Sequence, residues 1–483
     1  MSLVISILFT LILILNISLA AAIIFLERRN IASTWSWLMV LVFIPIAGFI
    51  IYLIFGRNLS KKKIFHLSSK EIDEIQETIQ KQENELRHEL VHYNDPVMVD
   101  YEEMIYMNLN KGHSTFTQDN HIEIFTDGRK KFEALFESLE QAREHIHLQY
   151  YIIRNDDLGK KLVNILTKKA NEGVKVRVLC DDWGTRVPRR FFKDLRAAGG
   201  EVAAFFPSKI PYLNFKLNNR NHRKIVVIDG ICGFLGGFNV GEEYLGLRKK
   251  FGYWRDTHLK ICGSAVHLLQ SRFFLDWNNA SHQHLLQFDE KYFPNILEPK
   301  GKAGMQIVSS GPDSKWQQIK NGFISMIHLA KESVYIQTPY FIPSDSVMNA
   351  LLIAALSGVD VRIMIPNKPD HIFVYWASLS HIGELLDAGV KCYIYNEGFI
   401  HAKTIVVDGK IASVGTANID IRSLKLNFET TAFIYDSQVS LELKKTFEQD
   451  LKKCWELTPE IYKQRPRRVK FKESISRLLS PIL

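Results

Sequence analysis

The 483-residue chain is expected to fold as two α/β halves of one design, preceded by a hairpin of two transmembrane helices. Three observations predict this arrangement: a motif that occurs twice, an internal repeat around each copy, and two long apolar segments at the N-terminus. Strands that alternate with helical stretches favour mixed sheets flanked by helices in each half. We expect a pseudo-twofold axis to relate the halves and to bring equivalent strands face to face.

The repeated motif runs from His222 to Gly230 and again from His401 to Gly409. Each copy reads His-x-Lys, four mostly β-branched residues, then Asp-Gly, which predicts a buried strand that ends in a turn. Residues two apart in a strand share a face, so the imidazole and the ammonium of each copy point the same way. Two such strands side by side would place two histidines and two lysines around one small space.

The internal repeat extends well beyond the motif. In each half a helix ends and runs into a strand, a second helix stops at a glycine before another strand, and a third strand follows a further glycine. The matched segments are Ala142–Ile152 with Ala330–Tyr340, Asn171–Leu179 with Leu356–Met364, and Ala197–Gly199 with Asp387–Gly389.

Composition restricts the possible partners of the chain. A net charge of +9 and a pI near 9.0 indicate an anionic partner, either nucleic acid or an anionic membrane surface. The five cysteines are scattered and odd in number, which argues against a disulfide framework or a zinc site. The catalytic part is therefore expected to face a reducing compartment.

The N-terminus favours the membrane over nucleic acid. Leu3–Leu26 contains no charged residue, and Ile31–Gly56 is a second apolar segment long enough to cross a bilayer. A cleaved signal peptide with Ala20–Ala22 as its cleavage site is the alternative, but the first segment lacks a basic start and a second span follows at once. The basic residues after the second span predict that the large domain is cytoplasmic: Arg57, Lys61, Lys62 and Lys63.

These features divide the chain into five parts. We expect two transmembrane helices in residues 1–58, a charged helical linker in 59–118, one half in 119–262, the second half with a connecting segment in 263–460, and a basic amphipathic tail in 461–483. The tail fits two interpretations equally well, a helix on anionic lipid or an ordinary solvated end.

The paired motif suits the displacement of a phosphodiester. His222 and His401 can act as nucleophile and acid, because an imidazole reaches both protonation states near neutral pH. The oxygens of the phosphate would be surrounded by Lys224, Lys403, Asn239 and Asn418, with no metal required. Asp256 and Glu429 follow the two histidines at similar distances, and we expect them to orient the imidazoles. Asp229 and Asp408 complete the candidate catalytic set, with backbone binding as the alternative role.

At these residues the chain resembles the phospholipase D superfamily, whose signature is a duplicated His-x-Lys-x4-Asp motif followed by Gly and Asn. Gly237 stands where that superfamily commonly has Ser or Thr. The resemblance is closest to the bacterial cardiolipin synthases, through the paired spans, Gly252–Asp256, Ser309–Pro312 and the Ser480–Leu483 end.

This resemblance implies transfer of a phosphatidyl group from one phosphatidylglycerol to another, which gives cardiolipin and glycerol through a phosphohistidine. It implies His222 as nucleophile and His401 as acid/base, with the exchanged roles nearly as plausible. It further implies no cofactor, phosphatidylglycerol and anionic membrane lipid as partners in place of nucleic acid, and a multi-pass location in the bacterial cell (inner) membrane.

Three other functions are compatible with the residues. A phospholipase D that hydrolyses lipids would use the same site with water as acceptor. A membrane-tethered phosphodiesterase or nuclease would explain the basic pI, although the apolar spans add nothing to it. A non-catalytic lipid-binding scaffold would keep its function after either histidine is replaced.

Overall fold

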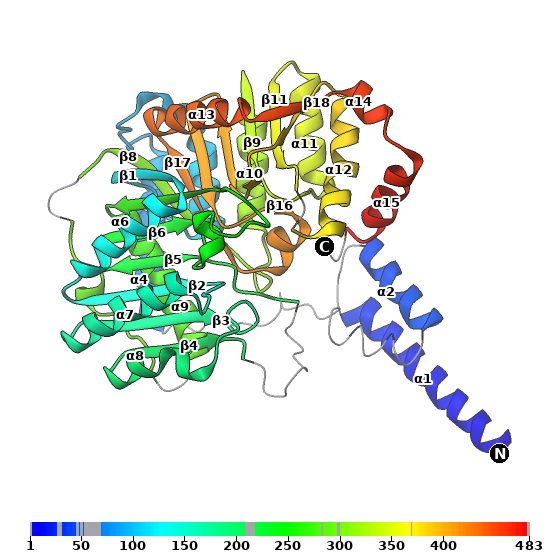
Figure 1. Cartoon of the computed structure of the whole chain (residues 1–483), viewed down its shortest axis with the longest axis horizontal. Coiled ribbons are helices and arrows are strands. Elements are labelled where there is room, and N and C mark those ends of the chain that lie inside the picture. Colours follow the sequence, from blue (N-terminus) through cyan, green and yellow to red (C-terminus); the bar gives the residue numbers. More distant parts are fainter. Residues whose placement is uncertain are drawn as a thin grey trace.

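The computed structural model describes residues 2–26, 31–44, 48, 52, 69–207, 218–281, 284–296, 300–368 and 370–480. At the N-terminus, α1 (Ser2–Leu26) and α2 (Ile31–Phe43) project away from the body of the molecule (Figure 1). Most of the second expected span beyond α2 lies outside the described residues. No helix in the described ranges combines the length and apolarity required of a membrane span.

The first half alternates strands and helices as the repeat predicts. Its α6 begins at the cap Asp127, whose carboxylate accepts the backbone N–H of Arg129 and Lys130. The elements are β1 (Thr117–Asp127), α6 (Gly128–Glu140), β2 (His145–Tyr150), α7 (Asp157–Asn171), β3 (Lys175–Asp181), α8 (Lys193–Ala197), β4 (Glu201–Phe205), β5 (Ile225–Ile228), β6 (Cys232–Gly236) and β7 (Trp254–Cys262).

The second half, which follows α9 (Ala265–Ala280), repeats this order with additional short elements. The glycines that end α7 and α11 (Asp345–Leu356) are equivalent: Gly173 and Gly358 have φ values of 93° and 91°, which only glycine adopts easily. The elements are β8 (Ala303–Ser310), α10 (Gln318–Leu329), β9 (Ser333–Gln337), β10 (Phe341–Ile342), α11 (Asp345–Leu356), β11 (Asp360–Pro366), α12 (Ile372–Leu386), β12 (Lys391–Tyr395), β13 (Phe399–Ile400), β14 (Thr404–Val407), β15 (Ile411–Gly415), β16 (Ile419–Asp420), β17 (Glu429–Tyr435), α13 (Ser437–Leu451) and β18 (Cys454–Leu457).

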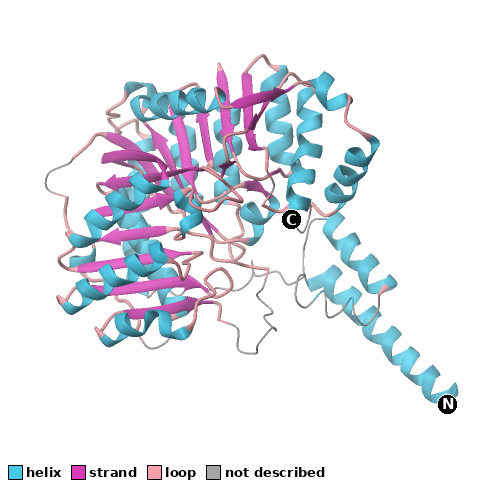
Figure 2. Ribbon diagram, viewed as in Figure 1, coloured by secondary structure: helices cyan, strands magenta, loops and turns pink. Residues whose placement is uncertain are grey.

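The two halves share one continuous mixed sheet across the described residues. Its order is β18-β12-β11-β9-β14-β15-β17-β8-β1-β7-β6-β5-β2-β3-β4, with β13 paired to β7. β1 and β8 pair antiparallel and join the halves. The strand order outward from β1 to β4 is equivalent to the strand order outward from β8 to β12. Figure 2 shows the strands of the halves at opposite ends of the body with helices packed over them. The expected α/β class with mixed sheets is confirmed.

Apolar residues form a core in each half and a third core between the halves. The shared core brings Val227 of β5 and Leu259 of β7 together with Val406 of β14 and Val414 of β15, all of them buried. Packing of equivalent strands against each other places the two motif segments close together, and this positions the site.

The segment before β1 packs against the second half. In α5 (Glu102–Gly112) the side chains of Ile105 and Leu109 are fully buried in the second-half core, and α4 (Ser69–Arg87) adds Ile79 and Leu86. Part of the charged helical linker therefore belongs structurally to the second half.

The C-terminal tail contains α14 (Pro459–Lys463) and α15 (Arg467–Leu478), and α15 packs on α12. Its inward face is polar, with Glu473 and Ser476 buried, whereas Phe471 and Leu478 are 68% and 76% exposed. The amphipathic character of this helix is thus inverted relative to the body, with apolar side chains directed outward.

Candidate active site

The His-x-Lys residues of each motif lie directly before a strand. His222 and Lys224 precede β5, and His401 and Lys403 precede β14, so the histidines and lysines lie outside the strand ladders that we expected to include them. The backbone N–H of His222 donates to the carbonyl of Phe428 at 3.0 Å, and that of His401 donates to the carbonyl of Arg255 at 2.7 Å. Each histidine segment is therefore bound by the backbone of the opposite half.

The expected orienting carboxylates contact the histidines crosswise. Nδ1 of His222 lies 3.0 Å from both carboxylate oxygens of Glu429, which belongs to the second half. Nδ1 of His401 lies 2.7 Å from Oδ2 of Asp256, which belongs to the first half. Both carboxylates are fully buried. In each pair the carboxylate contacts Nδ1, so Nε2 is the ring nitrogen that can react. At His401, Nζ of Lys403 lies 3.2 Å from Nε2.

The two carboxylates have different supports. Glu429 accepts the hydroxyl of Thr416 at 2.5 Å, whereas Asp256 accepts the backbone N–H of Thr257 at 2.8 Å. The position equivalent to Thr416 is Gly237, and a Cβ atom there would lie 1.9 Å from Oδ1 of Asp256. The carboxylate of Asp256 thus lies where a side chain at position 237 would begin, which accounts for the glycine there.

Burial shifts the titration of both motifs. The pKa of His222 is lowered by burial, and burial with the nearby Lys403 ammonium lowers the pKa of His401 to about 4. Burial also lowers the pKa of Lys224 to about 7 and that of Lys403 to about 8. The charge of Lys403 acts on both His222 and Lys224. The two motifs therefore share one electrostatic environment.

Each lysine folds back on its own histidine segment. Nζ of Lys224 donates to the carbonyl of His222 at 2.6 Å, and Nζ of Lys403 donates to the carbonyl of His401 at 2.5 Å. Aromatic rings flank the imidazoles: Tyr151 is 5.0 Å from His222 between ring centroids. These contacts hold the backbone of each histidine segment and pack Tyr151 against the His222 ring.

The two asparagines are buried close to the motifs. Asn239 accepts the backbone N–H of Ile152 and donates to the hydroxyl of Tyr244, while Nδ2 of Asn418 donates to Asp420. Oδ1 of Asn418 is buried with no hydrogen-bond partner among the described residues. Binding of substrate phosphate by these two amides stays a prediction.

Asp229 and Asp408 lie at the far ends of β5 and β14 from the histidines. The carboxylate of Asp229 accepts the backbone N–H of Arg143, Glu144 and His145 at 2.8–2.9 Å. Asp408 repeats this with Lys331, Glu332 and Ser333 at 2.7–2.9 Å. Both carboxylates bind backbone N–H groups, as in the alternative role that the sequence left open. A catalytic role for Asp229 and Asp408 stays a prediction.

Sequence reasoning missed a buried ion pair within the motif. The guanidinium of Arg223, between His222 and Lys224, makes two 2.9 Å contacts with Asp276 of α9. It also donates to the carbonyl of Glu429 and to the hydroxyl of Thr430. The signal for this pair is Asp276 itself, a single charge in the apolar run Phe273–Trp277.

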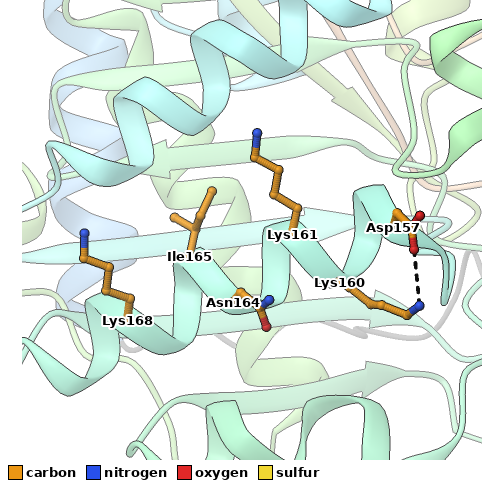
Figure 3. Close-up of a pocket in the computed structure, with 6 residues that line it drawn as sticks. All are labelled: Asp157, Lys160, Lys161, Asn164, Ile165 and Lys168. Atoms are coloured by element: carbon orange, nitrogen blue, oxygen red, sulfur yellow. Dashed lines mark hydrogen bonds and ion pairs between the residues drawn. The ribbon is translucent and has the colours of Figure 1, made fainter.

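Two cavities lie apart from the histidines. A hollow on the outer face of α7 is lined by three lysines and Asp157 (Figure 3). A larger cavity of about 790 Å³ lies against α9 and the end of β8, and Arg223 forms part of its wall. In the described part of the chain, no group of three or more His, Cys, Asp or Glu side chains is placed to hold a metal ion.

Comparison with known proteins agrees with this geometry. The family model described as "Cardiolipin synthase, PLD-like domain" matches residues 135–251 and 323–451, which include both histidines. The chain belongs to the cardiolipin synthase family. A second model, "Phospholipase_D-nuclease N-terminal", matches residues 14–57, where the two spans are expected.

Among curated members of the cardiolipin synthase family, the Major cardiolipin synthase ClsA of Bacillus subtilis is 56% identical over 479 residues, 99% of each chain. The cardiolipin synthase of Listeria monocytogenes serotype 4b is 54% identical over 477 residues, again 99% of each chain. The crystal structure of phosphatidylserine synthase from Haemophilus influenzae is similar in fold, with a TM-score of 0.60 and 16% identity. It covers 79% of this chain and 100% of that chain.

Proposed function

We propose that this protein transfers a phosphatidyl group from one phosphatidylglycerol to a second, forming cardiolipin and releasing glycerol. The observation that carries the proposal is the crosswise pair of His–carboxylate contacts, which supplies two imidazoles oriented through Nδ1. Full-length similarity to named cardiolipin synthases supports the choice of lipid over nucleic acid.

In the first step, Nε2 of His222 attacks phosphorus, and the bond from phosphorus to the glycerol oxygen breaks. A phosphohistidine forms, and a proton from Nε2 of His401 passes to the departing glycerol. In the second step, His401 takes the proton of the terminal hydroxyl of the incoming phosphatidylglycerol. That oxygen attacks phosphorus, the nitrogen–phosphorus bond breaks, and cardiolipin leaves with His222 restored.

The protonation states fit these roles. A lowered pKa keeps the His222 imidazole neutral near pH 7, as a nucleophile requires. His401 must bind a proton to act as the acid, although its pKa without substrate is about 4. The negative charge of a bound phosphodiester raises the pKa of a neighbouring imidazole, so substrate itself promotes protonation of His401. Lys224 and Lys403 would hold the phosphate oxygens.

We further propose that residues 3–26 and 31–56 form a transmembrane hairpin and that the catalytic halves lie on the cytoplasmic side, in a multi-pass arrangement. The apolar sequences and the basic residues after the second segment support this topology. Cysteine labelling of inside-out and right-side-out vesicles tests it; labelling of the catalytic halves from the outside would contradict the orientation.

The decisive assay gives detergent-solubilised protein radiolabelled phosphatidylglycerol and separates the products. We expect cardiolipin and glycerol from the native chain, and neither from His222→Ala or His401→Ala, whereas His328→Ala on the exposed side of α10 stays active. Label retained on the protein in His401→Ala but not in His222→Ala would assign the nucleophile. Phosphatidic acid as the sole product would instead indicate hydrolysis, and no lipid turnover would redirect the search to nucleic acid.

A further inference from the structure

The ends of the active site differ in charge, although the halves repeat each other. Beside His401, the hydroxyl of Tyr340 donates to the carboxylate of Asp370, and the Tyr340 ring lies edge-on to the imidazole at 6.5 Å. Asp370 follows β11, and both residues are only partly buried. The Asp370 charge acts on His401 and on Lys403, raising the pKa of each against the effect of burial.

The corresponding place beside His222 has no accessible carboxylate among the described residues. Tyr151 lies edge-on to His222, but the charges that act on its hydroxyl include the guanidinium groups of Arg220 and Arg422. Apart from Glu429, the acid that acts on Tyr151 is Asp181, which is 1% exposed and accepts backbone N–H groups of Trp183, Gly184 and Asn221. Because Asp181 is buried and both of its oxygens accept backbone N–H groups, it is not available to a ligand.

We propose that Asp370 and Tyr340 form the binding site for the glycerol headgroup, on the side of His401. This assignment rests on the proposed function and extends it to the polyol specificity of the same site. One oxygen of Asp370 accepts the Tyr340 hydroxyl and the other accepts the backbone N–H of His371. Each carboxylate oxygen can accept a second hydrogen bond, so adjacent hydroxyls of a glycerol unit can bind to the partly exposed carboxylate. Asp370 and Tyr340 also line a hollow of about 10 Å³, which is the size of one water or hydroxyl group.

The chemistry favours a neutral polyol over an ammonium headgroup. The Lys403 ammonium contacts His401 on the same side, so a second cation close to it would be repelled. The site next to the acid His401 is where the glycerol oxygen departs and where the terminal hydroxyl of the second phosphatidylglycerol enters. One subsite therefore serves both steps, because the leaving group and the acceptor present the same hydroxyl pattern.

The test uses the reverse reaction of the full-length protein in detergent, with cardiolipin as donor and small alcohols as acceptors. Native protein should prefer glycerol to 1-propanol. Asp370→Asn should reduce this preference about tenfold or more through a higher KM for glycerol, as expected for loss of a charge-assisted hydrogen bond. Tyr340→Phe should act in the same direction. Asp387→Asn, which removes an exposed carboxylate at the other end of α12, is the matched control.

An unchanged ratio of glycerol to 1-propanol in both variants would overturn the subsite while the transferase function stood. A native preference for ethanolamine that Asp370→Asn abolishes would overturn it in favour of an ammonium site. Equal losses with both alcohols would show that Asp370 is only structural and would also reject the proposal. Failure of the native protein to make cardiolipin from phosphatidylglycerol is a separate result that rejects the function itself.

Discussion

The carboxylate of Glu429 lies 3.0 Å from Nδ1 of His222, although 207 residues separate them in the chain. Asp256 and His401 form the reciprocal pair across 145 residues. Each half thus supplies the carboxylate that contacts the imidazole of the other half. A chain shortened to one half would contain a motif but no oriented histidine.

Glu429→Gln tests this relationship. The amide keeps the shape of the side chain but removes the negative charge that stabilises a charged His222. Cardiolipin formation should fall between about 10²- and 10⁴-fold, the range that general acid–base catalysis contributes. The control is Glu456→Gln on the exposed face of β18, which should keep the native rate. A native rate in Glu429→Gln would show that the contact does not serve catalysis.

Gly237→Ala should impair the other pair. Its Cβ atom would lie 1.9 Å from Oδ1 of Asp256, so the carboxylate must move away from His401. Displacement of a catalytic group by about 1 Å lowers kcat roughly 10²-fold. Gly112→Ala, where the nearest atom is 3.8 Å away, should be nearly neutral. Equal kcat values for the native chain and Gly237→Ala would contradict the tight fit.

Asp229→Asn and Asp408→Asn should affect stability more than turnover. Each carboxylate accepts three backbone N–H groups, and an asparagine leaves part of this set unpaired, at a cost of about 1–3 kcal/mol. Thermal unfolding should show the loss, while activity per folded molecule stays close to native. Asp157→Asn on the surface of α7 is the control. Folded variants as inactive as the histidine variants would show that these aspartates act in catalysis.

Buried histidines should make the protein less stable in mild acid. Burial lowers the pKa of His145 to about 4 from its ordinary value of 6.5. Between these values the unfolded chain binds a proton that the native protein does not, so stability is complete above about pH 6.5 and falls as the pH drops toward 4. This group alone accounts for about 3 kcal/mol.

Unfolding measured at pH 7 and pH 4.5 checks this expectation. His145→Leu should lose less stability between the two pH values than the native protein, because it removes one of the groups that bind protons on unfolding. His328→Leu, an exposed position, should keep the native pH dependence. Equal losses for the native chain and His145→Leu would exclude a contribution from His145.

The residues of the site were predictable from the sequence where the signal lies within a short stretch of the chain. The repeated His-x-Lys pattern and its surroundings identified two α/β halves, and the order of polar residues identified Asp256 and Glu429. The crosswise contacts were not predictable, because they depend on how equivalent strands pack in the shared core. The His-x-Lys pattern leaves Arg223 as a variable position, and its partner Asp276 of α9 lies 53 residues away in the chain, so the sequence does not connect the two.

The placement of His222 and His401 before the strands also follows from packing. Each histidine segment bonds to a strand or loop of the other half in place of its own ladder neighbours, through the Phe428 and Arg255 carbonyls. An alternating sequence pattern predicts extended backbone. It does not tell whether that backbone pairs with its own neighbouring strands or with the other half.

Asp229 and Asp408 adopt left-handed conformations, with φ values of 51° and 54°. Their carboxylates accept backbone N–H groups at the starts of β2 and β9. These hydrogen bonds favour one register for the pairing of β5 with β2 and of β14 with β9. A slip of one residue would turn the side chains of β5 and β14 to the opposite face and would displace the His-x-Lys residues directly before each strand. The aspartate that ends each motif therefore helps to hold the histidine and lysine at its start in place.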